Sequence, residues 1–121
     1  MPRRWANKFR EAFHGIGLAF RYESSFRVHV LVAVAVVVLA TLLKCDVLEW
    51  GLLVLCIGVV LGAEAFNASI ETLFHALDDS TKARMTGCLD RAAGAVLLVC
   101  IASAVVGLVI FGRRGYLLLN P

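Results

Sequence analysis

Three long apolar stretches, separated by short polar segments, dominate the hydrophobic pattern of this chain. They cover residues 28–43, 51–77 and 92–111. A membrane-spanning helix needs about 20 mostly apolar residues. The first stretch is only about 24 Å long as a helix, and the neighbouring Lys44, Val47 and Leu48 extend it. The pattern therefore predicts an all-α membrane protein with three transmembrane helices, forming a single domain over residues 1–121.

Residues 3–21 have a different, amphipathic pattern. Apolar side chains recur every three or four positions, and mostly basic side chains fill the positions between them: Trp5, Phe9, Phe13, Ile16 and Phe20 against Arg3, Arg4, Lys8, Arg10, Glu11 and Arg21. Such a helix is typical of the surface of an anionic leaflet. The alternative is a helix packed on a protein core, but no soluble core is apparent. We expect a surface helix.

Polar side chains interrupt the second apolar stretch at a helical spacing. Glu64, Asn67 and Glu71 lie at i, i+3 and i+7, so they share one face of a helix. A charged residue inside a membrane helix costs about 2.5–3.5 kcal/mol and is by default a candidate functional residue. The stretch is longer than the membrane requires, so we expect Glu71 near the interface and Glu64 deeper. Gly58 and Gly62 form a small-residue pair that suits close helix packing.

The basic residues predict the orientation in the membrane. Half of the 12 Lys and Arg residues precede the first apolar stretch, and Lys82, Arg84 and Arg91 follow in the polar segment 78–91. The connector at residues 44–50 carries Lys44 alone. Because basic loops stay in the cytoplasm, the N-terminus is expected inside and the C-terminus outside a bacterial cytoplasmic membrane.

Composition supports the membrane assignment, and chain length indicates that several copies assemble. Hydrophobic residues make up 60% of the 121 residues, whereas a soluble domain has about half. So short a chain spans the bilayer only a few times, and an enclosed site therefore needs neighbouring copies. The four cysteines, at positions 45, 56, 88 and 100, show neither a disulfide nor a metal-binding spacing. We interpret them as small apolar residues.

The polar residues near the cytoplasmic face suit one kind of chemistry. The chain contains no Walker-type loop, no dinucleotide-binding fingerprint, no HExxH pair and no GxSxG elbow. Oxygen ligands suit Mg²⁺, and basic residues beside them suit a polyphosphate, as phosphoryl transfer requires. An acceptor hydroxyl at this depth would belong to a lipid. The residues concerned are Glu23, Glu64, Asn67, Glu71 and Asp90, beside Lys82, Arg84 and Arg91. By pattern alone, Glu23 is better interpreted as a solvated linker carboxylate.

Several segments resemble the small prokaryotic integral-membrane diacylglycerol kinases and their undecaprenol kinase relatives. EAFNASIE at 64–71 is similar to that family's Glu-x-x-Asn-small-small-Ile-Glu signature, and ESSFRVH at 23–29 resembles its Glu-x-x-Phe-Arg segment. LEWGLLVLCIGVVLGAE at 48–64 resembles its second span, and DRAAGAVLL at 90–98 the start of its third. The segments occur in the family's order and cover most of the chain.

The resemblance implies a homotrimeric enzyme that phosphorylates a membrane lipid alcohol with ATP, at sites formed between subunits. Glu64 would be the base for the lipid hydroxyl, and Glu23 and Glu71 would hold Mg²⁺. The other implied substrate- and nucleotide-binding residues are Asn67, Asp90 and Arg27. The acceptor would be diacylglycerol or undecaprenol, and no nucleic acid partner is expected.

This chain departs from the family pattern beside the expected nucleotide site. The family usually has Lys directly before the Asp of its third span, where this chain has Leu89, and the preceding loop, DDSTKARM, also differs. We therefore expect Lys82, Arg84 or Arg91 to supply the cation for the phosphates. Two alternatives stay open: a catalytically silent membrane scaffold or regulator, and a proton- or ion-conducting subunit. The second is less consistent with the sequence because no matching acidic groups lie towards the outside.

Overall fold

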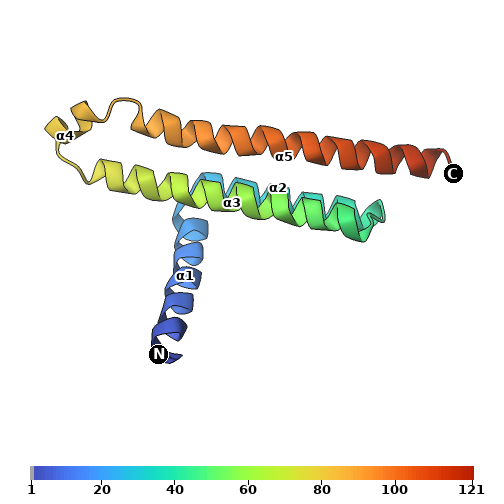
Figure 1. Ribbon diagram of the computed structural model, residues 1–121, viewed down its shortest axis with the longest axis horizontal. Coiled ribbons are helices and arrows are strands. Elements are labelled where there is room, and N and C mark those ends of the chain that lie inside the picture. Colours follow the sequence, from blue (N-terminus) through green and yellow to red (C-terminus); the bar gives the residue numbers. More distant parts are fainter. Residues whose placement is uncertain (1) are drawn as a thin grey trace.

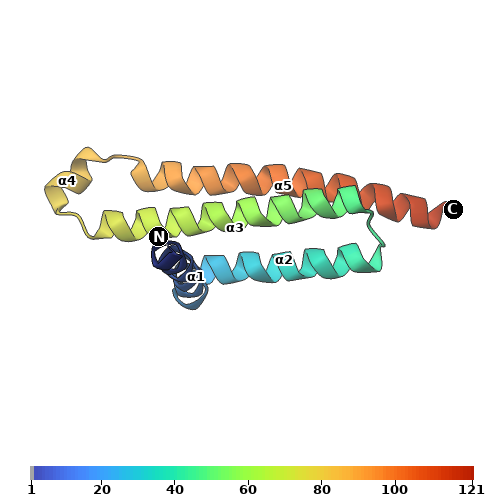
Figure 2. The ribbon, with the colours of Figure 1, turned by 60° about the horizontal axis from the view of Figure 1, so that its bottom comes forward.

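The computed structural model describes residues 2–121, with side chains from Arg4 onward. These residues form five α-helices and no strand, which confirms the all-α class: α1 (Pro2–Tyr22), α2 (Ser24–Leu42), α3 (Val47–His75), α4 (Asp79–Arg84) and α5 (Cys88–Leu119). Three of them, α2, α3 and α5, are long and apolar enough to cross a membrane. They run alongside one another, whereas α1 leaves the bundle at a steep angle (Figures 1 and 2).

A capping box begins α3. The Asp46 side chain accepts a hydrogen bond from the Glu49 backbone N–H (2.8 Å), and the Glu49 carboxylate accepts one from the Asp46 backbone N–H (2.9 Å). This reciprocal arrangement satisfies two otherwise unpaired N–H groups. As a result, α3 begins at Val47, about one turn before the apolar stretch itself. The connector from α2 is correspondingly short, with Lys44 at a positive φ of 54°.

The last helix, α5, extends beyond its apolar stretch at both ends. It follows Gly87, whose φ of 78° suits a residue without a Cβ. The predicted span ends at residue 111, but the helix continues through Arg113 and Arg114 to Leu119. This extension carries Arg114 to an ion pair with the start of α3.

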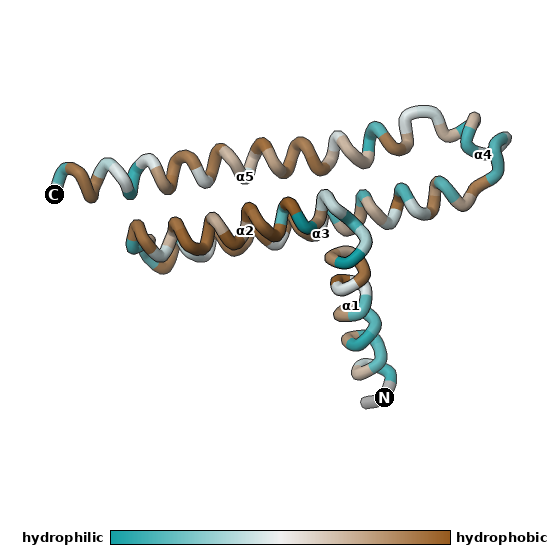
Figure 3. The backbone as a smooth tube through the Cα atoms, turned by 180° about the vertical axis from the view of Figure 1, so that it is seen from behind, coloured by the Kyte–Doolittle hydropathy of each residue, from teal (hydrophilic) through white to brown (hydrophobic). Residues whose placement is uncertain are grey.

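The protein core of a single chain is small. Ala40, Leu53 and Ile110 form one buried cluster that joins α2, α3 and α5. Most of the large apolar side chains on these helices are exposed, and Figure 3 shows the hydrophobic colour along all three. Such surfaces are stable when lipid or another protein chain covers them.

The junction between α1 and α2 is held by hydrogen bonds from Arg27. Phe26 is buried in the first turns of α2. The Arg27 guanidinium donates to the carbonyl oxygens of Phe20 (3.0 Å) and Arg21 (2.7 Å). These carbonyls belong to the last turn of α1, where helical acceptors otherwise lack partners. Arg27 therefore has a structural role at this corner.

Candidate active site

The polar face of α3 changes from buried to exposed along its length. Glu64 is only 6% exposed, and Asn67 is half-buried. Glu71 lies on the same face one turn further on, and its side chain is 53% exposed. The burial of the three side chains therefore follows the order expected for a helix that leads from an apolar interior towards water.

Glu64 has a partner on the neighbouring helix. His29, in the second turn of α2, places its Nε2 3.5 Å from Oε2 of Glu64, and the side chains are 24% and 8% exposed. The sequence alone does not identify this pairing. The pairing arises because α2 and α3 are antiparallel, so the start of α2 lies beside the middle of α3 (Figure 2).

Glu23 lies at a different surface of the molecule. It precedes α2 as the N-cap residue, and its side chain makes no capping hydrogen bond. Together with residues of α1 and α3, it lines a groove of about 900 Å³. Glu64, Asn67 and Glu71 are not among the residues that line this groove. A single chain therefore does not gather Glu23 and Glu71 in one cavity.

The predicted phosphate-binding cations lie at the end of the bundle where α3, α4 and α5 meet. Lys82 of α4 lies over the ring of Phe74 in α3, with Nζ 5.8 Å from the ring centroid. Arg84 is in the last turn of α4, and Arg91 is in the first turn of α5. Figure 1 shows this end as the α4 turn. The fold therefore brings these cations to the same end as the exposed Glu71.

The N-terminal cap of α4 orders the loop that carries two of these cations. Asp78 accepts hydrogen bonds from the Thr81 backbone N–H (3.1 Å) and the Ser80 hydroxyl (3.1 Å). Hydrogen bonds from Thr81 and Ser80 favour the ionised carboxylate and hold the pKa of Asp78 below its ordinary value. Within this polar segment, residues Asp79–Arg84 form a helix.

Asp90 lies in the first turn of α5, beside the C-terminal end of α3. The pairs Leu53 with Ile110 and Glu49 with Arg114 define the antiparallel register of α3 and α5. Continued along the helices, this register places Asp90 close to the level of Glu71. Asp90 itself is exposed. Leu89, which replaces the usual Lys, is half-buried beside it.

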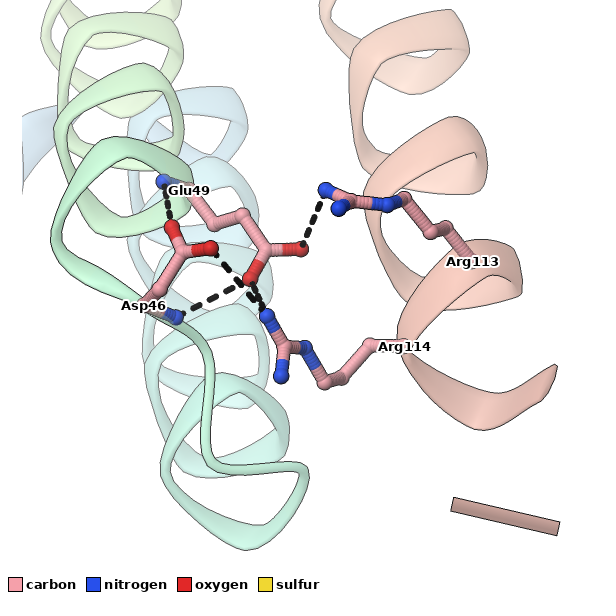
Figure 4. A network of polar contacts seen from close by, with 4 residues as sticks. All are labelled: Asp46, Glu49, Arg113 and Arg114. Atoms are coloured by element: carbon pink, nitrogen blue, oxygen red, sulfur yellow. Dashed lines mark hydrogen bonds and ion pairs between the residues drawn. The ribbon is translucent and has the colours of Figure 1, made fainter. Parts of the chain in front are cut away.

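A second polar cluster lies at the opposite end of the bundle, and its carboxylates, Asp46 and Glu49, correct the expectation that no acidic groups lie towards the predicted outer side. Arg114 of α5 pairs with Asp46 (3.2 Å) and with Glu49 of α3, and Arg113 lies 3.9 Å from Glu49 (Figure 4). Glu49 is only 3% exposed. The backbone N–H of Glu49 and the Arg114 cation together hold the pKa of Asp46 below its ordinary value.

A sequence signal for this cluster did exist. Asp46 and Glu49 have the spacing of a capping box, and the Arg113–Arg114 pair follows the third apolar stretch on the same predicted side of the membrane. The cluster is composed of two carboxylates and two guanidinium groups, and it joins α3 to α5. We interpret it as a structural clamp.

The donor atoms for a metal ion are limited within one chain. Among the described residues, no group of three or more His, Cys, Asp or Glu side chains lies close enough to hold a metal. All four cysteines are free, consistent with their interpretation as apolar residues.

Comparison with known proteins identifies the family. The family model of prokaryotic diacylglycerol kinase matches residues 10–111. The undecaprenol kinase of Bacillus subtilis is 32% identical over 108 residues, which cover 89% of this chain and 88% of that protein. The diacylglycerol kinase of Synechocystis is 34% identical over 93% of this chain but 61% of its own length. A Helicobacter pylori diacylglycerol kinase is 40% identical over 56% of this chain and 59% of its own length.

No solved structure matches the chain with comparable significance. The family match extends over all three apolar helices and includes the α3 segment with Glu64, Asn67 and Glu71. The chain therefore belongs to the prokaryotic diacylglycerol kinase family, in which the related proteins named above are lipid kinases.

Proposed function

We propose that this protein transfers the γ-phosphoryl group of ATP to the hydroxyl of a membrane lipid, either diacylglycerol or undecaprenol, at the cytoplasmic membrane interface. The observation that carries the proposal is the buried carboxylate Glu64, on a face of α3 that leads to the exposed Glu71. Cations lie at that same end of the bundle. Family membership supports the kinase class.

In the proposed reaction, Glu64 accepts the proton of the lipid hydroxyl. The hydroxyl oxygen forms a bond to the γ-phosphorus, and the bond between that phosphorus and the β–γ bridging oxygen breaks. ADP leaves with the electron pair. Asn67, on the same face as Glu64, supports the site as a hydrogen-bonding group. A positioned general base contributes about 10²–10⁴-fold to such a step.

Mg²⁺ fits the oxygen donors of this chain. Glu23 and Glu71 would hold it, since Mg²⁺ takes one or two protein carboxylates together with water and substrate phosphates. When bound, the metal neutralises charge on the β- and γ-phosphates. Asp90 and Arg27 would lie on the substrate and nucleotide side, where Arg27 also caps α1.

We further propose a homotrimer in which neighbouring subunits complete each site. In one chain, Glu71 is not among the residues that line the groove beside Glu23, and the apolar helices are largely exposed. Gly58 and Gly62 face open space, since an added Cβ at either would meet no atom within 4 Å. This leaves room for a second helix to approach closely.

The arrangement that we propose in the membrane rests on the exposed apolar side chains and the direction of α1. Its exposed apolar side chains, including Trp5, Phe9 and Phe13, suit the headgroup region of a bacterial cytoplasmic membrane. Because α1 runs across the bundle axis (Figure 1), it would lie along the surface. The N-terminus would then be cytoplasmic and the C-terminus outside.

A lipid kinase assay tests the proposal directly. Purified protein in mixed micelles is incubated with radiolabelled ATP and either diacylglycerol or undecaprenol, with and without Mg²⁺. We expect labelled phosphatidic acid or undecaprenyl phosphate, formed only when Mg²⁺ is present. Comparing kcat/KM for the two lipids identifies the preferred acceptor.

A negative result in this assay has a defined meaning. If intact oligomers phosphorylate neither lipid, the kinase proposal fails, and the silent scaffold, motivated by Leu89 and the altered loop, is favoured. Product formation without Mg²⁺ would instead contradict the metal role of Glu23 and Glu71.

The missing family Lys at Leu89 leads to a prediction about the basic residues nearby. We expect alanine at Lys82, Arg84 or Arg91 to raise the KM for ATP about tenfold at one or more positions. A hydrogen bond to a charged group contributes about 1.5–3 kcal/mol, and tenfold corresponds to about 1.4 kcal/mol. Steady-state kinetics with varied ATP measures the change.

Lys44→Asn is the matched control, because Lys44 lies at the opposite end of the bundle and asparagine tolerates its positive φ. Its KM for ATP should remain that of the wild type. If all three alanine variants keep the wild-type KM and kcat, these cations do not bind the phosphates.

A further inference from the structure

The contact between His29 and Glu64 gives the proposed base a specific neighbour. The Nε2 atom of His29 lies 3.5 Å from Oε2 of Glu64, across the interface of α2 and α3. Among the described residues, His29 is the one side chain within ion-pair distance of Glu64. The side chains of His29 and Glu64 are 24% and 8% exposed, so the contact is largely shielded from solvent.

Few polar groups near His29 could hydrogen-bond to it in place of Glu64. His29 lines an open cavity of about 470 Å³ between α2, α3 and α5. The other lining residues are apolar except for Ser103 and two cysteines on α3 and α5. In an apolar environment, a carboxylate without a hydrogen-bond partner is costly. A single neighbouring donor therefore has a large influence on its orientation.

We propose that His29 is a positioning residue for the reaction: its imidazole donates an Nε2–H hydrogen bond to Oε2 of Glu64 and so leaves Oε1 free to accept the lipid hydroxyl proton. The proposal rests on the proposed kinase function. In the structure the two atoms are slightly beyond the usual hydrogen-bond distance of 2.7–3.2 Å. Catalytic hydrogen bonds are often long without substrate and shorten in the substrate complex.

The proposed role depends on donation by the ring and not on its size. Glutamine has an N–H donor at a similar reach and does not titrate. Leucine fills a similar volume without a donor. His29→Gln should therefore preserve the orientation of Glu64, and His29→Leu should remove it while leaving the helix packing intact.

Steady-state kinetics on the two variants provides the first test. We expect His29→Leu to lower kcat about 10–100-fold, the range that corresponds to loss of a hydrogen bond to a charged group. The KM for ATP should stay within about twofold of the wild type, since the nucleotide cations are at another level of the bundle. His29→Gln should retain kcat within about threefold. His14→Leu, on exposed α1, is the matched control and should match the wild type.

A spectroscopic measurement tests the contact independently of turnover. In ¹⁵N-histidine NMR spectra of the full chain in micelles, we expect the neutral His29 ring to be protonated at Nε2. Its resonances should shift in Glu64→Gln, whereas those of His14 should not. The His29 signal is assigned by its loss in His29→Gln.

The outcomes separate this inference from the kinase proposal. An inactive wild-type protein would overturn the kinase function and, with it, the positioning role. An active wild type whose His29→Leu variant keeps full kcat would overturn the positioning role alone. So would a His29→Gln variant as impaired as His29→Leu, or a His29 ring that is unaffected by Glu64→Gln.

Discussion

Replacing Glu64 with glutamine is expected to lower kcat about 10²–10⁴-fold, the usual contribution of a positioned general base. Glutamine keeps the shape of the side chain and one acceptor oxygen, with an NH₂ donor in place of the other, but it does not accept the hydroxyl proton. Glu64 is buried, and removing its charge does not leave an unpaired ion in the apolar interior. The KM for ATP should change little. The measurement is the rate of lipid phosphorylation at saturating ATP and lipid.

Glu49→Gln is the matched control for this experiment. Glu49 is the other buried carboxylate of α3, but it lies at the opposite end of the helix, in the cluster with Arg114. Folded Glu49→Gln protein should keep the turnover of the wild type. If Glu64→Gln also keeps it, Glu64 is not the base, and the site must use another proton acceptor.

Replacing Arg114 with leucine is expected to lower the free energy of unfolding by about 3–5 kcal/mol, the usual cost of removing one partner of a buried ion pair. The change leaves the 3% exposed Glu49 with a charge and only the more distant Arg113 beside it. It also separates the end of α5 from the start of α3. Reversible unfolding in detergent, followed by circular dichroism, measures the effect.

Two further variants test whether the lost stability comes from the ion pair of Arg114 with Glu49 or from the loss of any positive charge at this end of α5. Arg113→Leu should cost less than about 1 kcal/mol, because Arg113 is 63% exposed and exposed pairs contribute little. The double variant Glu49→Leu with Arg114→Leu should recover part of the lost stability, since it removes the buried Glu49 charge together with its partner but also the capping hydrogen bond to the Asp46 backbone N–H. A double variant no more stable than Arg114→Leu alone would contradict this explanation.

The prediction of the helices from sequence succeeded because hydrophobic pattern and length are local properties. Residues 28–43, 51–77 and 92–111 correspond to α2, α3 and α5, which the structure confirms as long apolar helices. Helix ends were less predictable. The start of α3 depends on the Asp46–Glu49 capping box, and the extension of α5 to Leu119 accompanies a contact between two helices.

For the candidate site, too, one part could be predicted from the sequence and another part could not. Spacing along one helix predicted that Glu64, Asn67 and Glu71 share a face, because a helix sets the azimuth of each residue from its position alone. The roles of Glu23, Glu71 and Asp90 were suggested by family resemblance and stay predictions, since one chain does not bring Glu23 and Glu71 into one cavity. In the homotrimer that we propose, a second subunit brings them together.

By itself, the sequence determined that this protein is a helical membrane protein of the diacylglycerol kinase family, with a polar face on its second span. Those properties follow from local hydrophobicity, spacing and motifs. Only the tertiary structure decided that His29 faces Glu64 and that Arg114 faces Glu49. Each of these pairs joins two antiparallel helices, and the register between such helices comes from their packing, as at Ala40, Leu53 and Ile110. No pattern within one helix contains that information.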